Sequence, residues 1–289
     1  MKFGLRYCNS GRYTDPALAV ELVQAGEAAG FESAWTVEHT VVPRGYQSTY
    51  PYATGGKLPG GDGDFVLPDP LIWMAYVAAA TTRIKLATGV LILSQHNPVI
   101  TAKQVATLDA MSGGRVLLGV GVGWLREEFE VIGAVFEERG KRCDEYIAVM
   151  REFWSADRPT FSGKFFNFKD AYMRPKPVNG TVPIIVGGHS TAAAKRAGRL
   201  AEGFFPARGA SPELIDLVRR TAERHGRDPA SVEITASLPD DLDDLPKLAA
   251  SGISRVLVPV TGNFGLGRRI SGPEDLLSWR DTIEKYAAL

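Results

Sequence analysis

Two adjacent ionisable side chains, Glu38 and His39, stand at the end of a short apolar segment, residues 33–37. A histidine at the end of a strand can act as a general acid or base near neutral pH, because its charge state changes readily there. A strand-end histidine that is bonded only to backbone is the alternative, and position alone leaves both interpretations open. We take His39, with Glu38 beside it, as the candidate catalytic pair.

Two further histidines, His96 and His189, follow later apolar segments in the same way. Three histidines that converge at one edge of a sheet could bind zinc, as in a zinc hydrolase. No metal-binding spacing connects them, and we predict no metal site.

A second candidate is an anion site. A buried apolar strand passes through Gly187 and Gly188 to His189, Ser190 and the start of a helix. Bare backbone amides, a hydroxyl group and the positive end of the helix dipole would meet there, which suits a phosphate. Two glycines before a helix are also ordinary turn chemistry, so the pattern leaves both interpretations open. Arg208 follows the next strand and could reach a phosphate bound there.

The third feature is a ladder of glycines at alternate positions, Gly119, Gly121 and Gly123, followed by Trp124. Side chains alternate between the two faces of a strand, so one face of this strand carries no side chains. We expect a flat or bulky group to lie against this backbone.

Short apolar segments and helical patterns alternate along the whole chain and would position these residues. The predicted strands span residues 3–7, 33–37, 84–91, 116–122, 183–186, 203–206, 231–236 and 255–258. The predicted helices span residues 16–29, 70–81, 99–111, 142–154, 191–201, 212–225, 242–250 and 273–288. Such alternation is typical of parallel strands joined by crossover helices. Eight units favour an α/β (β/α)8 TIM barrel formed by one domain, residues 1–289, although an open sheet with helices on both faces fits the same pattern.

Two insertions interrupt the alternation. Residues 43–68 are rich in glycine, proline and tyrosine, and we interpret them as a loop over the active site in which Tyr46 and Tyr50 contact substrate. A disordered surface loop is the alternative. Residues 160–168 carry aromatic residues on both sides of Ser-Gly-Lys and predict a small hairpin. It would cover the barrel mouth or a subunit contact, or pack on its own helix.

Bulk composition excludes several classes of protein. The chain has 33 basic and 33 acidic side chains among 289 residues, which gives no support to nucleic-acid or anionic-membrane binding. No apolar run reaches the length of a membrane span, and the first residues look like a strand rather than a signal peptide. We therefore expect a cytoplasmic protein. Its two cysteines lack any paired spacing, which excludes a disulfide framework.

The chain resembles the luciferase-like monooxygenase superfamily, and most closely its branch of oxidoreductases that depend on the deazaflavin coenzyme F420. The matching segments span about the first 205 residues and are 30–39, 97–98, 102–104, 107–109, 112–115, 119–124, 174–177 and 187–188. The resemblance implies a barrel whose mouth binds a flavin or deazaflavin, with the coenzyme phosphate at Gly187, Gly188 and Ser190. It also implies a bulge at Gly89 and Val90, often with a non-proline cis peptide, behind the coenzyme ring, and an acid/base role for His39.

Trp124 departs from the family pattern. Some deazaflavin dehydrogenases of this family carry a glutamate at this position, and here the next glutamate along the chain is Glu127. The two-residue proton relay of those enzymes therefore does not transfer intact. We interpret Trp124 as an apolar wall for the substrate, with plain packing as the alternative.

Our leading hypothesis is hydride transfer between F420 and a small-molecule substrate. The main alternative is an FMN-dependent monooxygenase that uses oxygen and a partner flavin reductase. A non-catalytic coenzyme-binding protein and a zinc hydrolase are further alternatives. Relatives in the family lead us to expect a homodimer.

Overall fold

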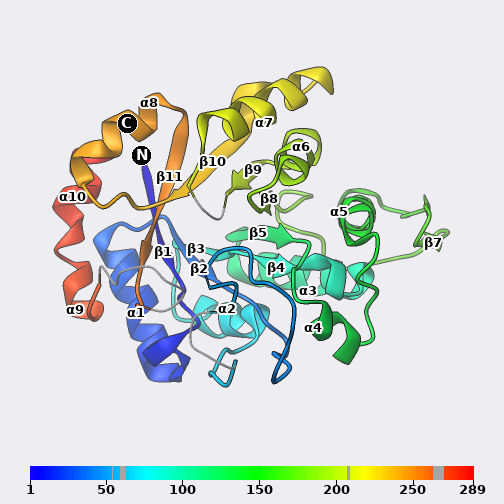
Figure 1. Cartoon of the computed structure of the whole chain (residues 1–289), viewed down its shortest axis with the longest axis horizontal. Coiled ribbons are helices and arrows are strands. Elements are labelled where there is room, and N and C mark those ends of the chain that lie inside the picture. The colour runs from blue at the N-terminus through cyan, green and yellow to red at the C-terminus, as the bar shows by residue number, and fades with distance from the viewer. Residues whose placement is uncertain (54, 59–62, 207–208, 263–269) are drawn as a thin grey trace.

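A closed barrel of parallel strands forms the centre of the molecule (Figure 1). The computed structural model describes residues 1–53, 55–58, 63–206, 209–262 and 270–289. The barrel strands are β1 (Lys2–Arg6), β2 (Ser33–Thr36), β3 (Lys85–Thr88), β4 (Leu91–Ile92), β5 (Val116–Gly121), β8 (Ile184–Gly187), β9 (Gly203–Phe205), β10 (Glu233–Ser237) and β11 (Ile253–Pro259). Pairing runs β3-β2-β1-β11-β10-β9-β8-β5, and the β3–β5 pairing closes the ring. The fold is the predicted (β/α)8 TIM barrel.

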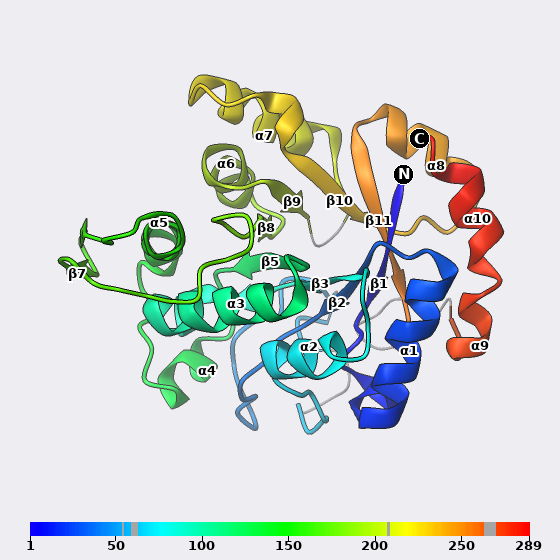
Figure 2. The same ribbon diagram turned by 180° about the vertical axis from the view of Figure 1, so that it is seen from behind.

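Helices surround this barrel on its outside, as the two opposite views show (Figures 1 and 2). The longer ones are α1 (Pro16–Ala29), α2 (Pro70–Ala78), α3 (Pro98–Ser112), α5 (Arg139–Ser155), α6 (Thr191–Leu200), α7 (Pro212–Arg224) and α10 (Trp279–Tyr286). The shorter ones are α4 (Arg126–Val131), α8 (Leu245–Ala250) and α9 (Pro273–Leu276). The two termini lie side by side, and the amino group of Met1 donates to the carbonyl of Tyr286 at 2.9 Å. No helix in the described ranges is both long and apolar enough to cross a membrane.

Local capping chemistry explains where the helices begin and end. Asp15 accepts from the amides of Ala17 and Leu18 at the start of α1. Pro16 suits the first helical position, because the backbone N–H that proline lacks would have no partner within the helix there. Gly30 ends the same helix with a φ of 95°, a conformation that glycine adopts without steric cost. This pattern is legible in the sequence, and the predicted bounds of α1 are correct.

Strand alternation divides the core into an inner and an outer layer. Inside the barrel, Trp35, Ala87, Leu117, Ile185, Phe205 and Leu257 form one buried cluster. Their chain neighbours Ala34, Leu86 and Phe204 belong instead to the larger cluster that packs under the helices. Because successive side chains of a strand point to opposite faces, the apolar runs of the sequence serve both layers.

The third strand is interrupted where the resemblance implied a bulge. Ala87 of β3 pairs with Leu117, and Leu91 of β4 pairs with Val120, so one extra residue lies on the third strand. The Gly89–Val90 peptide between them is cis. The predicted strand 84–91 is therefore wrong as a continuous element, whereas the implied bulge and cis bond are both present.

The two insertions have different environments. The hairpin of β6 (Phe161–Ser162) and β7 (Asn167–Phe168) has the predicted fold and packs on α5, where Phe168 stacks on Phe153 at 4.5 Å between ring centroids. Of the alternatives for residues 160–168, packing on their own helix is the one observed. The described part of residues 43–68 instead turns over the barrel mouth and buries Tyr46 and Leu58.

Several predicted bounds need correction. The helix expected at 273–288 is divided into α9 and α10, and residues 242–244 form a short 3-10 helix ahead of α8. Helix α4 was not predicted, because its run Arg-Glu-Glu-Phe-Glu-Val is short and strongly charged. These three corrections concern short elements, whose hydrophobic period spans too few turns to be recognised.

Candidate functional site

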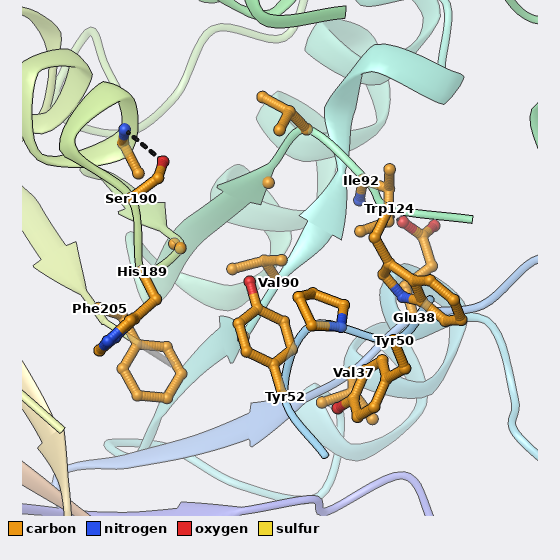
Figure 3. A pocket seen from close by; sticks show the side chains of 18 of the residues that line it. Val37, Glu38, Tyr50, Tyr52, Val90, Ile92, Trp124, His189, Ser190 and Phe205 are labelled. Carbon is orange, nitrogen blue, oxygen red and sulfur yellow. Dashed lines mark hydrogen bonds between the residues drawn. The ribbon is translucent and has the colours of Figure 1, made fainter. Parts of the chain in front are cut away.

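A cavity of about 1280 Å³ opens at the carboxyl ends of the barrel strands (Figure 3). This is the end at which barrels of this type keep their sites. The predicted site residues that line it are Glu38, His39, Tyr50, Gly89, Val90, Gly121, Trp124, Gly187, Gly188, His189 and Ser190. The fold thus brings together residues from five separate segments of the sequence.

One predicted site residue that the structure describes, Tyr46, does not line this cavity. Tyr46 is buried beneath the loop, and its hydroxyl accepts from the amide of Leu58 at 2.7 Å. It packs against Trp124 with ring centroids 5.6 Å apart. The ring of Tyr46 therefore supports the loop and the tryptophan, and its contact with substrate stays a prediction. Arg208 lies outside the described residues.

His39 forms a buried pair with a glutamate that the sequence analysis missed. Its Nδ1 lies 3.0 Å from Oε2 of Glu128 in α4. The other oxygen of Glu128 accepts from the amides of Thr40 and Val41, at 2.7 and 3.2 Å. Burial raises the pKa of Glu128, but the hydrogen bonds from His39 and Val41 outweigh burial and hold this pKa below its usual range. An ionised carboxylate only accepts hydrogen bonds, so Nδ1 of His39 carries a proton.

This tautomer determines what His39 can do. When its imidazole is neutral, Nε2 is left as a proton acceptor, and when it is charged, Nε2 is a donor. His39 lines the cavity. The pair is therefore suited to move a proton to or from a ligand in the cavity.

Glu38 is occupied by a second histidine pair. Its Oε1 lies 2.8 Å from Nε2 of His96, and its Oε2 accepts from the amide of Ile92. Burial lowers the pKa of His96, but the hydrogen bond to Glu38 and nearby carboxylate charges outweigh burial and leave this pKa raised. Glu38 therefore ties the end of the bulged third strand to β2. These contacts give Glu38 a positioning role, and its expected direct catalytic role stays a prediction.

The glycine ladder faces the chain's own bulge. A Cβ atom added to Gly121 would lie 2.6 Å from Cγ2 of Val90, and one added to Gly187 would overlap Cγ1 of Val90. A Cβ atom on Gly119 would overlap the carbonyl oxygen of Thr88. The bulky group that lies against the ladder at Gly121 is therefore the side chain of Val90. Gly121 and Gly187 let Val90 sit between β5 and β8, from where it forms the floor of the cavity.

The start of α6 forms one end of the cavity. Ser190 caps this helix by accepting from the amide of Ala193 at 3.1 Å, which is the dashed contact in Figure 3. Gly188 has a φ of 132°, and a Cβ atom there would lie 3.0 Å from the Cβ of Ala193. Backbone can thus approach a ligand closely at a helix N-terminus, the arrangement that suits a phosphate.

Trp124 forms an aromatic wall at the opposite side of Val90 (Figure 3). Its ring meets those of His39 and Tyr50 edge-on, with centroids 5.9 and 5.1 Å away. Tyr50 also contacts Tyr52 at 5.4 Å. The wall therefore joins His39 to the 43–68 loop.

Glu127 holds this loop over the cavity. Its Oε1 accepts from the amides of Gln47 and Ser48, at 2.6 and 3.0 Å. Burial raises the pKa of Glu127, but the bonds from Ser48 and Gln47 outweigh burial and bring this pKa to about 2. The two adjacent glutamates of α4 therefore have different tasks, since Glu127 anchors the loop and Glu128 orients His39.

A basic wall on the far side of the cavity was also missed. Arg6, Tyr7, Phe205 and Ser237 line it from the ends of β1, β9 and β10. The sequence signal for Arg6 was its position in the predicted strand 3–7. Arg6 lies two residues after Gly4, so both residues face the same side of that strand. Among the described residues, no group of three or more histidine, cysteine, aspartate and glutamate side chains is placed to hold a metal ion.

Comparison with known families accounts for this architecture. The model of the luciferase-like monooxygenase family matches residues 4–265. The chain belongs to this family. An F420-dependent glucose-6-phosphate dehydrogenase from Mycobacterium avium is 32% identical over 255 residues, which cover 85% of this chain and 70% of the relative.

Solved structures of the family share the fold. An F420-dependent secondary alcohol dehydrogenase in complex with an F420–acetone adduct has a TM-score of 0.75 at 19% identity, and 99% of this chain and 98% of that chain are covered. A monooxygenase from Streptomyces bottropensis has a TM-score of 0.71 at 19% identity, and the coverage is 100% and 99%. At these identities the likeness describes the luciferase-like barrel alone.

Proposed function

We propose that this luciferase-like protein is an oxidoreductase that transfers hydride between coenzyme F420 and a small organic substrate. The observation that carries the proposal is one cavity that joins three parts: the glycine-flanked start of α6, the Val90 floor and the His39–Glu128 pair. The F420-dependent relative in Mycobacterium avium supports the choice of coenzyme.

The residues present fit such a coenzyme. Its phosphate would be held by the backbone of Gly187 and Gly188, the hydroxyl of Ser190 and the first amides of α6. Its flat ring would lie against Val90, which the missing Cβ atoms of Gly121 and Gly187 allow to take this position. When bound, F420 would supply a two-electron hydride donor or acceptor.

His39 is the residue that we assign to proton transfer. Glu128 keeps the proton on Nδ1, so that Nε2 exchanges the proton that accompanies the hydride. Glu128 lies on α4, four residues after Trp124. Some relatives place a glutamate at the position that Trp124 occupies in this chain. We infer that this chain supplies its carboxylate to the histidine from α4, while Trp124 and Tyr50 exclude water and shape the substrate space.

An FMN-dependent monooxygenase is the second candidate. The similarity to the Streptomyces bottropensis monooxygenase favours it, and a phosphate site beside a ring-sized floor suits both coenzymes. This function would need oxygen and a partner flavin reductase. The homodimer also stays a prediction, which light scattering of the purified protein checks.

A coenzyme titration separates the two candidates. Of the five tryptophans, Trp124 alone lines the cavity, so bound coenzyme should quench its fluorescence. We expect F420 to bind at least about tenfold more tightly than FMN, a difference of about 1.4 kcal/mol in binding free energy. Replacing Trp124 by phenylalanine should remove most of the quenching. The control is Trp279→Phe, because Trp279 packs on Phe3 and Phe31 away from the cavity. Tight FMN binding with no F420 binding would overturn the choice of F420.

A further inference from the structure

Arg6 is a buried cation at the cavity wall. It is the last residue of β1 and lies on the barrel's inner face, two residues after Gly4, whose added Cβ would meet Leu257 and Trp35. The side chain is only 7% exposed and lines the cavity. Arginine cannot lose its proton in a protein, so a full positive charge stands here.

The guanidinium group lacks a carboxylate partner among the described residues. Nη1 donates to Oγ of Ser237 at 2.7 Å, and Nε is buried without a hydrogen-bond partner. The Cζ atom lies 4.7 Å from the ring centroid of Tyr7 and 4.9 Å from that of Phe205. Burial raises the pKa of Tyr7 more than the charge of Arg6 and the hydrogen bond between the two side chains lower it, so the phenol stays neutral and is no counter-ion.

The other buried arginines of the described chain are satisfied. Arg255 pairs with Glu32 and Glu233, and Arg196 pairs with Asp144. Arg115 donates four hydrogen bonds to oxygen atoms around it. Arg6 is therefore the exception. A buried charge without such partners is costly to the fold, and cation–π contacts offset only part of the cost.

The cavity has room for a ligand that would satisfy this charge. Its volume of about 1280 Å³ exceeds that of an ordinary single-ligand pocket, which reaches roughly 1,000 Å³. Phe205 lies on the His189 side of Val90 in Figure 3, away from Trp124 and Glu38. The glutamates that line the cavity are already paired, Glu38 with His96 and Glu138 with Lys164. They leave the positive charge of Arg6 available.

We propose that Arg6 and Ser237 form a subsite that binds the carboxylate of a small organic acid, the substrate or product of the oxidoreductase reaction. The planar guanidinium matches a carboxylate through parallel N–H donors, and the Ser237 hydroxyl adds a further donor. The apolar part of the ligand would lie along the rings of Tyr7 and Phe205, which line the same cavity beside Arg6. The class of substrate rests on the proposed function, whereas carboxylate binding itself does not.

The test compares an acid with an amide of the same shape. Butanoate and butanamide are titrated into the protein, with and without coenzyme, and binding is followed by ligand-observed NMR. The unmodified protein should bind butanoate about tenfold or more tightly than butanamide, because charge-assisted hydrogen bonds are lost with the amide. Arg6→Met should abolish the preference, and Arg6→Lys should retain part of it. The matched control is Arg12→Met, since Arg12 also lies over a tyrosine ring, that of Tyr13, but is exposed and outside the cavity lining.

Thermal unfolding shows that the variant is folded. Arg6→Met removes a buried charge that has no carboxylate partner, so its melting temperature should equal or exceed that of the unmodified protein. Added butanoate should raise the melting temperature of the unmodified protein and of Arg12→Met, but not of Arg6→Met. If Arg6→Met proves unstable, Ser237→Ala serves instead and should weaken butanoate binding several-fold.

Three results would overturn the proposal: no preference for the acid, an equal preference in Arg6→Met, or a loss of coenzyme affinity in Arg6→Met with unchanged butanoate binding. The last would place the guanidinium against the coenzyme. A failure of the proposed function can be told apart from a failure of this subsite. If butanoate binds through Arg6 while neither F420 nor FMN binds, the subsite stands and the coenzyme assignment falls.

Discussion

Replacing Glu128 by glutamine should release His39 from its fixed tautomer. The glutamine carbonyl can still accept from the amides of Thr40 and Val41, as Oε1 of Glu128 does. The new amide group would then face Nδ1 of His39, 3.0 Å away in the native pair. Two donors cannot share this contact, so the proton of the neutral imidazole should move from Nδ1 to Nε2.

The structure also gives the size of the effect on stability. Glu128 is buried, and its bond to His39 joins two ionisable groups. Hydrogen bonds to charged groups contribute about 1.5–3 kcal/mol, and the two amide bonds also lose their charge assistance. We expect Glu128→Gln to lower the free energy of unfolding by about 3 kcal/mol. A double-mutant cycle with His39→Ala should assign about 1.5–3 kcal/mol of this loss to the pair.

Two assays measure these effects. Nitrogen-15 NMR of the histidine rings reports the tautomer of His39, and urea unfolding reports stability. Glu127→Gln is the matched control. The Glu127 carboxylate stands next to Glu128 in the chain, accepts from two loop amides and makes no bond to His39. A proton on Nε2 in the unmodified protein, or the same tautomer in both proteins, would refute the assignment of His39 as the proton-transfer group oriented by Glu128.

The pH dependence follows from the lowered pKa of Glu128. A carboxyl group whose pKa is lower in the folded state stabilises the fold above its unfolded pKa, near 4.5, and this contribution disappears as the pH falls through the folded value. The stability difference between the unmodified protein and Glu128→Gln should therefore be full at about pH 7 and shrink below about pH 4.5. A difference that persists undiminished at lower pH would contradict the ionised pair.

Three further predictions concern the cavity floor, the phosphate end and the second histidine pair. Gly121→Ala should push Val90 into the cavity and weaken coenzyme binding about tenfold or more. The double variant Gly121→Ala, Val90→Ala should restore binding, and fluorescence titration measures both effects. Ser190→Ala should weaken coenzyme binding several-fold and cost about 1 kcal/mol of stability; Ser211→Ala, which removes the cap of α7, should cost similar stability and leave coenzyme binding unchanged. Because the pKa of His96 is raised, its pair with Glu38 stabilises the fold fully below about pH 6.5 and loses this effect as the pH rises through the folded value. Urea unfolding of the unmodified protein and His96→Gln should therefore differ more at about pH 5.5 than at about pH 8.5, and an equal difference at both would contradict the pairing.

Much of the barrel was predictable because its signals are local. The Asp15-Pro16 start and the Gly30 end of α1 lie within the helix's own sequence, and so do the Asn97-Pro98 start and the Gly113 end of α3. Barrel closure depends on pairing between β3 and β5, which eight similar units favour but do not prove. The interruption of the third strand came from family resemblance, since the run 84–91 alone looks like one continuous strand.

The site was predictable in its members and less so in their contacts. Strand ends correctly indicated that His39, Trp124 and Ser190 would meet at one cavity. The partner of His39 was missed because Glu128 stands in a charged helix 89 residues away, and sequence does not show which of two adjacent glutamates faces inward. The group that faces the ladder could not be named from the sequence for a related reason. Missing side chains reveal that something approaches the backbone, but not that the approaching group is Val90.

A crystal structure of the protein with F420 tests the central claim most directly. The account predicts the coenzyme phosphate within hydrogen-bond distance of Ser190 and the first amides of α6, the deazaflavin ring in contact with Val90, and Nε2 of His39 facing the ring's reactive side. A ring bound away from Val90, or a phosphate held elsewhere than at the start of α6, would contradict it.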